Sequence, residues 1–270
     1  MNEIAKMISS LVLYALIGYV AFALILFVFQ RKLLYLPSDF KPTKEQLVEE
    51  GLHYWPSYED HRGLTHAKEP KDVEGTVIVF HGNAGTAYHR RFYIDALSQY
   101  KLRIILAEYP GYGGRGGQPS EDVLVRDALE TLQLVYQTYG EPLFLWGESL
   151  GSGVISSVVS QTDIPLKGLA LFLPWNSLAK VAQTHYWYLP ARWLVLDQYR
   201  SVDNLRHFEG NIAVMLAEDD EVIPAHHGRT LYESIKTKKK LWLFAGAGHN
   251  TVPIKAELPW WKEVADFIKK

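Results

Sequence analysis

The sequence predicts an α/β fold preceded by a membrane-spanning helix. Short apolar runs alternate with helical patterns along most of the 270 residues, the stretch 7–30 carries no charge, and one aromatic-rich segment interrupts the alternation. The composition, 48% hydrophobic and 21% charged, is that of a folded globular chain. A net charge of −2 argues against a nucleic-acid partner, and the lack of cysteine excludes disulfides, cysteine nucleophiles and cysteine-ligated metals.

The apolar stretch 7–30 predicts a transmembrane anchor, because at about 1.5 Å per residue it can cross a hydrocarbon core of about 30 Å. A buried core helix is the alternative, but so long a stretch at a chain end favours a membrane. A cleavable signal peptide fits less well, since no small-residue cleavage site precedes the basic sequence that follows. Several basic residues follow the stretch, starting at Arg31, against Lys6 before it. We therefore expect a single-pass protein whose carboxyl-terminal domain is cytoplasmic.

The domain that follows, residues 33–270, contains continuous apolar runs that suit central strands of a parallel sheet covered on both faces. The expected strands are Thr76–Phe80, Arg103–Tyr109, Pro142–Trp146, Leu166–Leu173, Asn211–Ala217 and Lys240–Ala245. Two earlier runs, 52–58 and 62–67, alternate more and predict an antiparallel edge.

Helices are expected between these strands. Ser120 suits an N-cap, acidic residues follow it, and apolar residues then recur at helical spacing until Gly140. The other expected helices are Ala87–Ser98, Leu150–Gln161, Ala225–Ile235 and Pro259–Ile268. Strand–helix alternation of this kind predicts an α/β fold with right-handed crossovers.

The aromatic-rich segment, about residues 174–206, is expected to form a cap. An insertion at the strand ends of an open α/β sheet lies where ligands usually bind. We expect Trp175, Trp187 and Trp193 to line a pocket for an apolar acyl group. Plain core packing of these aromatics is the alternative.

The motif Gly147-Glu148-Ser149-Leu150-Gly151 lies between an apolar strand and a helix, where G-x-S-x-G forms a nucleophile elbow. So sharp a turn needs small neighbours, which explains Gly147 and Gly151. Ser149 is the expected nucleophile, above a helix amino end whose dipole favours negative charge.

A serine nucleophile needs a base, and His249 is the expected one because it follows the last strand in a glycine-rich loop. His226 and His227 open a helix and are expected to be solvated. An acid should orient the imidazole, and the segment 218–221 offers four carboxylates of which one must reach inward.

An oxyanion needs two donors, and the backbone N–H of Leu150, directly after the nucleophile, is one. The loop after the strand Thr76–Phe80 has small residues that let the backbone approach a ligand. The backbone N–H of Asn83 is the expected second donor, and His81 is expected to hold the loop in shape.

The segments HGNAG, YPGYGGRGGQPSE, GESLGSG, DDEVIP and GAGHN resemble successive signatures of the α/β-hydrolase superfamily. The similarity is greatest to its N-terminally membrane-anchored serine hydrolases of the α/β-hydrolase-domain type, and it spans Leu33–Lys270. The resemblance implies an eight-stranded, mostly parallel sheet and hydrolysis of ester, thioester or amide bonds. It also implies that Asp220 is the catalytic acid. Ala217 departs from the glycine that similar proteins often have.

A competing motif, G-x-G-x-x-G at residues 111–116, is typical of dinucleotide sites. Pro110 precedes it, the next helix is delayed, and no acid ends a strand about 20 residues on, so no cofactor is expected. Arg115 is expected to be a solvated loop residue.

These observations predict a membrane-anchored serine hydrolase that cleaves carboxylic esters or thioesters of apolar acyl groups. Its partners would be a small-molecule or lipid acyl substrate and the membrane, with no metal or cofactor. A serine peptidase on the same fold is one alternative. A non-catalytic membrane-tethered scaffold is another, although a scaffold would not need nucleophile, base, acid and oxyanion loop together.

Overall fold

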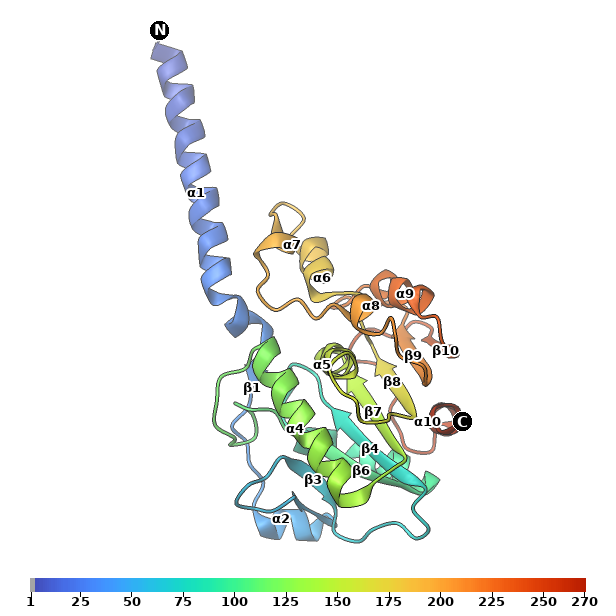
Figure 1. Cartoon of the computed structure of the whole chain (residues 1–270). Coiled ribbons are helices and arrows are strands. Elements are labelled where there is room, and N and C mark those ends of the chain that lie inside the picture. The colour runs from blue at the N-terminus through green and yellow to red at the C-terminus, as the bar shows by residue number, and fades with distance from the viewer. Residues whose placement is uncertain (1–2) are drawn as a thin grey trace.

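A computed structural model describes residues 3–270 and contains one eight-stranded sheet (Figure 1). Its strands in chain order are β2 (Leu52–Trp55), β3 (Gly63–His66), β4 (Gly75–Phe80), β6 (Leu102–Ala107), β7 (Leu143–Glu148), β8 (Gly168–Phe172), β9 (Asn211–Ala217) and β10 (Lys239–Phe244). The spatial order is β10-β9-β8-β7-β4-β6-β3-β2. β3 pairs antiparallel with both β2 and β6, and the other pairings are parallel. The α/β-hydrolase fold and its antiparallel edge are confirmed.

Helices cover both faces of this sheet. The helices of residues 3–270 are, in chain order, α1 (Glu3–Leu34), α2 (Lys44–Glu49), α3 (Phe92–Leu97), α4 (Glu121–Tyr139), α5 (Leu150–Val159), α6 (Leu178–His185), α7 (Ala191–Leu194), α8 (Ser201–Asn204), α9 (Ala225–Ser234) and α10 (Pro259–Lys269), with 3₁₀ turns η1 (Ala87–Arg90) and η2 (Ser98–Tyr100). Ile78 and Phe80 of β4 face the core under α4 and α5, whereas Val77 and Val79 face the core under α3 and α10. Both faces of β4 are therefore buried, which is why its sequence is continuously apolar.

Three short elements, one helix and two strands, are not predicted from the sequence. Thr43 and Gln46 form a capping box that starts α2. β1 (Leu36–Pro37) pairs in parallel with β5 (Ala84–Gly85). This pairing attaches the chain just after α1 to the loop that follows β4. The single helix expected over residues 87–98 is divided into η1, α3 and η2.

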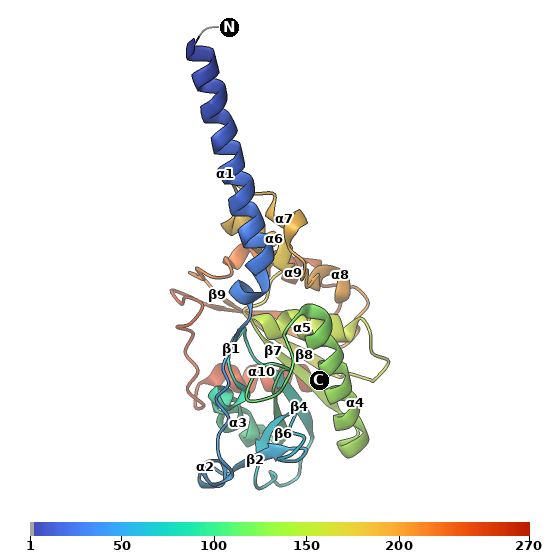
Figure 2. The same ribbon diagram turned by 90° about the vertical axis from the view of Figure 1, so that its left-hand side faces the viewer.

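α1 extends well beyond the domain, as Figure 2 shows. Within it, Lys6–Leu34 has a mean hydropathy of 2.7 over its most apolar window and is long and apolar enough to cross a membrane. The segment 174–206, which we call the cap, contains α6, α7 and α8. The cap contacts the carboxyl-terminal half of α1, where Arg31 pairs with Asp197 at 2.9 Å. The helix is thus joined to the domain by side chains as well as by the chain.

Candidate active site

Ser149 occupies a strained turn between β7 and α5. Its φ of 50° and ψ of −110° lie in a region that side chains rarely adopt. A Cβ at residue 147 would lie 2.5 Å from the Gly151 oxygen, and one at residue 151 would lie 1.9 Å from the Phe80 oxygen. Backbone therefore fills the space that side chains would need, and glycine is required at both positions.

His249 and Asp220 complete a continuous chain of hydrogen bonds with Ser149. The Nε2 of His249 lies 3.1 Å from the Ser149 Oγ, and its Nδ1 lies 2.7 Å from the Asp220 Oδ2. With a proton on Nδ1, Nε2 is left to accept the serine proton. The structure brings together the three residues expected from the sequence, in the geometry of a nucleophile, a base and an orienting acid.

The four candidate carboxylates in the loop after β9 differ in their exposure to solvent. Asp220 is buried, whereas Glu218, Asp219 and Glu221 are exposed. The Oδ1 of Asp220 accepts the backbone N–H groups of Val222 at 2.9 Å and Ile223 at 2.6 Å. Glu221 accepts the backbone N–H of His249 at 3.2 Å, and its own backbone N–H together with that of His249 lowers its pKa. Glu221 thus supports the histidine loop, a role that the sequence analysis did not anticipate.

The loop after β4 lies against the elbow. A Cβ on Gly82 would lie 3.7 Å from the Ser149 Cβ, and Asn83 and Leu150 line the same cavity as Ser149. The side-chain amide of Asn83 donates to the Leu34 oxygen at 2.7 Å, and its backbone oxygen accepts the Leu36 N–H at 3.0 Å. The end of α1 therefore positions the residue expected to supply the second oxyanion donor.

His81 and Glu108 form a buried pair that shapes this loop. The Nδ1 of His81 lies 2.7 Å from the Gly82 oxygen, and its Nε2 lies 3.0 Å from the Glu108 Oε1. The other oxygen of Glu108 accepts the Ala87 N–H at 2.9 Å. His81 thus has the structural position expected of it.

A second ion pair, half-buried and indicated by no sequence signal, involves the residue just before the nucleophile. Arg90 of η1 contacts both oxygens of Glu148, at 2.8 and 2.9 Å, and the Tyr93 hydroxyl donates to Glu148 at 3.1 Å. Burial disfavours the charged form of Arg90 and acts to lower its pKa. The charge of the Glu148 carboxylate and its hydrogen bonds have a larger effect, so the pKa of Arg90 is raised. The residue next to Ser149 is therefore fixed to the helical segment after β5.

Ser149 opens into a cavity of about 630 Å³, within the usual range for small-molecule sites. Its wall is mostly apolar and comes from three places: α1, the cap and the loops at the carboxyl edge of the sheet. Most of the α1 contribution is a stripe at helical spacing. The residues of α1 in the wall are Ala23, Leu26, Phe27, Gln30, Arg31, Leu33 and Leu34. The cap contributes mainly aliphatic side chains together with Trp175 and Tyr186. The apolar span is therefore part of the site.

Only one of the three expected tryptophans belongs to this wall. Trp175 lines the cavity, is 4% exposed and donates its indole N–H to the Tyr199 oxygen at 3.3 Å. Trp187 and Trp193 are outside the wall and are 78% and 70% exposed. The prediction that these two line a pocket beside Ser149 is wrong, because they project from the outer end of the cap.

Two polar residues expected on the solvated surface are instead buried, in the case of His227, or half-buried, in the case of Arg115. His227 is 3% exposed and lies between Asn176, at 3.1 Å from Nδ1, and Thr184, at 3.0 Å from Nε2. It joins α9 to the cap. Arg115 forms a short, largely buried ion pair with Asp127 at 2.6 Å, so the loop with the competing glycine motif is held by this pair. Among residues 3–270, no three His, Asp or Glu side chains lie together where they could hold a metal ion.

The profile of the family described as "Serine aminopeptidase, S33" matches residues 71–196. The Mycobacterium tuberculosis protein Rv2307c is 32% identical over 254 residues, which cover 91% of this chain and 90% of that protein. The zebrafish lysophosphatidylserine lipase ABHD12 is 30% identical over 222 residues, covering 72% of this chain and 58% of the lipase. The chain thus spans little more than half the length of that lipase.

Solved structures agree on the fold. The Pyrococcus furiosus esterase Pf2001 superimposes with a TM-score of 0.66 at 17% identity, covering 87% of this chain and 97% of the esterase. The monoacylglycerol lipase of Paleococcus ferrophilus gives a TM-score of 0.55 at 19% identity, covering 74% and 95%. At such identities the likeness shows the fold alone. Together with the sequence relatives, it establishes that the chain belongs to the α/β-hydrolase superfamily and is an esterase- or lipase-like serine hydrolase.

Proposed function

We propose that this protein is a membrane-anchored lipid esterase that acts through Ser149, His249 and Asp220. The observation that carries the proposal is the hydrogen-bonded chain from Asp220 through His249 to Ser149, at the base of an apolar cavity. The preferred bond is a carboxylic ester or thioester, because the cavity offers an acyl chain an apolar wall.

The geometry supports an acyl-enzyme mechanism. As the Ser149 Oγ attacks the carbonyl carbon, its proton passes to the Nε2 of His249, and Asp220 stabilises the imidazolium that forms. His249 then gives the proton to the departing alcohol or thiol. It next takes a proton from water, whose oxygen attacks the acyl carbon, and returns that proton to Ser149 as the acid leaves.

The oxyanion is assigned to two backbone N–H groups. Leu150 follows the nucleophile at the first position of α5, where helix N–H groups have no partner within the helix and the dipole favours negative charge. Asn83 contributes the second N–H from the loop after β4, and its side chain is held by the Leu34 oxygen. Each such donor supplies about 3 kcal/mol of transition-state stabilisation in related chemistry.

The anchor is assigned to residues 7–30 and the hydrolase domain to residues 33–270, with the cap at about 174–206. The basic residues that follow the span favour a cytoplasmic domain. Protease treatment of intact cells tests this orientation: a tag after Lys270 should survive, and its cleavage from outside would reverse the assignment.

A serine peptidase is the second candidate, and the description of the matching family profile favours it. The same serine machinery can cleave amides, and an exposed carboxylate, Glu221, lies in the cavity wall where a substrate amine could approach. A panel of acyl esters, acyl thioesters and amino-acid arylamides separates the candidates. Faster turnover of the arylamides would favour the peptidase.

A fluorophosphonate probe tests the nucleophile directly. The wild-type chain should be labelled, and Ser149→Ala should lose both labelling and ester hydrolysis, with kcat falling by several orders of magnitude. The kcat of His249→Ala should be reduced as much as that of Ser149→Ala. The kcat of the double variant should be no lower, because the two residues act as a unit. Ser160→Ala, at the exposed end of α5, is the matched control. Labelling or activity that persists in Ser149→Ala would overturn the mechanism.

A further inference from the structure

We propose that the outer end of the cap is embedded in the bilayer leaflet beside α1, so that lipid reaches Ser149 sideways from the membrane. The lipid route rests on the proposed activity, and the position of the cap rests on the proposed anchor at residues 7–30. The exposed outer end carries Trp187, Tyr188, Trp193 and Leu196, which we call the cap tip. The occupant of this surface is thus a lipid bilayer.

The cap tip is fixed at the level of the apolar span. The Tyr19 hydroxyl donates to the Tyr188 oxygen at 3.0 Å, and the ring of Phe22 stacks on that of Tyr188 with centroids 6.4 Å apart. Further along α1, the Gln30 side chain donates to the Leu194 oxygen at 3.3 Å and accepts the Leu196 N–H at 2.8 Å. The cap therefore lies alongside residues 19–30 of α1, as Figures 1 and 2 both show.

The length of α1 then requires the cap tip to enter the hydrocarbon layer. Only residues 7–18 of the uncharged stretch lie ahead of the first cap contact, and at about 1.5 Å per residue they span about 18 Å. A hydrocarbon core of about 30 Å leaves about 12 Å that must surround residues 19 onward and the cap beside them. Tilting of α1 would increase that remainder. Interfacial helices commonly sink about 5–10 Å into a membrane, so the required depth of about 12 Å is slightly greater than theirs.

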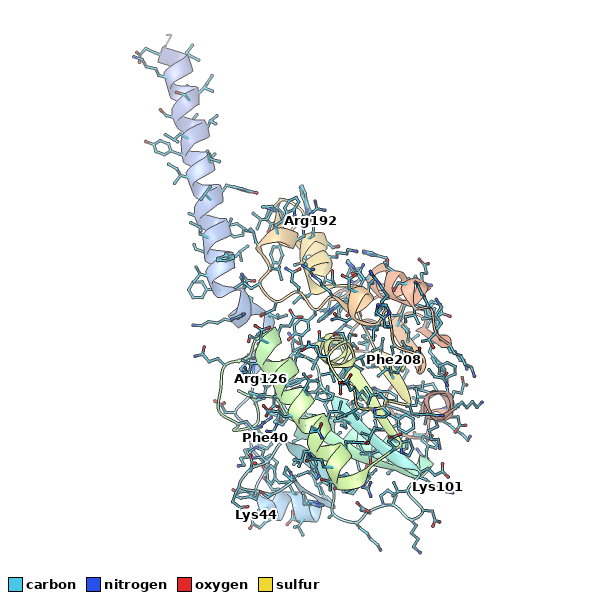
Figure 3. The ribbon with its side chains drawn as sticks, in the orientation of Figure 1. Phe40, Lys44, Lys101, Arg126, Arg192 and Phe208 are labelled. Atoms are coloured by element: carbon cyan, nitrogen blue, oxygen red, sulfur yellow. The ribbon has the colours of Figure 1, made fainter. Side chains whose placement is uncertain are left out.

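The chemistry of the cap tip suits this position. Tryptophan and tyrosine are the residues enriched at membrane interfaces. The cap carries four exposed ones, Tyr186, Trp187, Tyr188 and Trp193, and the two tryptophans are the most exposed aromatic side chains of the chain outside α1. Arg192 lies at the same end, far from Lys44 and Lys101 at the opposite end (Figure 3). Its guanidinium packs over the Trp193 ring at 4.0 Å, and its long stem lets the charge reach the headgroups.

The cavity extends to the same depth. Ala23, Leu26 and Phe27 line it from α1, and these positions belong to the part of the span that the bilayer must surround. Ser149 lies at the other end, beneath the cap. An acyl chain can therefore pass from the leaflet along α1 to the nucleophile without crossing water.

The absence of cysteine makes a depth measurement direct. The full chain carrying Trp187→Cys and a fluorescent label is placed in phosphatidylcholine vesicles with doxyl-labelled lipids. We expect doxyl lipids to quench this label several-fold more than the same label at Lys44→Cys, and aqueous iodide to do the reverse. Equal quenching at the two sites would overturn the embedding, whatever the activity of either variant.

A second measurement tests the lipid route. Leu26→Trp narrows the cavity from α1, and its matched control, Val28→Trp, lies outside the cavity wall and is exposed. For a long-chain monoacyl lipid in vesicles, Leu26→Trp should raise KM about tenfold, the loss of roughly two methylene contacts. For an acetyl ester, the rise in KM caused by Leu26→Trp should be smaller, because a short acyl group makes few of those contacts, and Val28→Trp should leave the KM for the long-chain lipid within about twofold of wild type. Equal effects of the two variants would overturn the route. Inactivity of wild type toward every ester would overturn the proposed function instead.

Discussion

Asp220 is held by three donors that fix which of its oxygens faces the imidazole. Val222 and Ile223 donate to Oδ1, and His249 donates to Oδ2. All three partners are hydrogen-bond donors. A carboxylate only accepts hydrogen bonds, so it can accept one from each of them. An amide at this position has one accepting oxygen, and its NH₂ would confront a donor on one side.

Asp220→Asn should therefore lower kcat by several orders of magnitude, about 10⁴ for such a change, because the amide favours the wrong histidine tautomer. Asp219→Asn is the matched control, since Asp219 is exposed, and it should change the rate only a few-fold. Both purified variants are compared on one short-chain ester. A severe loss confined to Asp219→Asn would move the acid by one residue.

The structure places single residues where the sequence predicts them wherever a local pattern dictates the position. The elbow is a short turn in which the serine requires glycine two residues before and two residues after it. His249 lies in the loop that follows the last strand. Alternation could not choose between Asp219 and Asp220, because the chain turns there, and the family resemblance made that choice. Arg90 and Glu148 lie 58 positions apart in the chain, so no local signal joins them. The residue type of an aromatic side chain does not show whether the side chain lines a pocket or faces outward. The prediction for Trp187 and Trp193 was wrong for this reason.

At the scale of elements, the cap is attached to the domain by buried polar contacts at both ends. Asp197 accepts from Arg31 and, at 3.1 Å, from the Tyr35 hydroxyl, so one end is tied to the exit of α1. At the other end, His227 of α9 bridges Asn176 and Thr184. Burial, with neighbouring positive charge, lowers the pKa of His227 to about 4.

This shift predicts that acid loosens the cap. His227 is neutral in the folded chain but binds a proton near pH 6.5 when unfolded, so its contribution is complete above that pH and is lost as the pH falls toward 4. At pH 5 the loss is about 2 kcal/mol relative to pH 7.5. Urea unfolding in detergent should show a smaller pH dependence for His227→Gln than for wild type. His207→Gln, at an exposed site, should behave like wild type; equal slopes for all three would contradict the assignment.

Elements were predictable in proportion to their length and burial. β4 and β9 are buried along their whole length, so their apolar runs mark them clearly. β1 and β5 have two residues each, too few for any periodicity, and only their pairing defines them. The helical pattern over 87–98 is interrupted because Arg90 turns inward to Glu148, a tertiary contact that overrides local propensity.

At the scale of the whole molecule, the cavity joins parts that the sequence analysis treated separately. α1, the cap and the sheet edge each supply part of its wall. The sequence presented residues 7–30 as a tether, because composition reports length and apolarity but not which helix face meets another element. A stripe of α1 faces the cap, so this helix also shapes the site.

The acyl-length profile should reveal this second role of α1. For soluble esters of increasing acyl length, kcat/KM of the full chain should rise about fourfold per methylene until the cavity is full, since each buried CH₂ gains about 0.8 kcal/mol. A chain lacking residues 1–30 keeps Leu34, which holds Asn83, so its acetyl-ester turnover should stay within a few-fold of the full chain. The shortened chain lacks Ala23, Leu26 and Phe27 in the cavity wall, so its kcat/KM should stop rising at a shorter acyl length than that of the full chain. Identical profiles would mean that the acyl chain does not contact α1, and a flat profile in the full chain would mean that the cavity does not bind it.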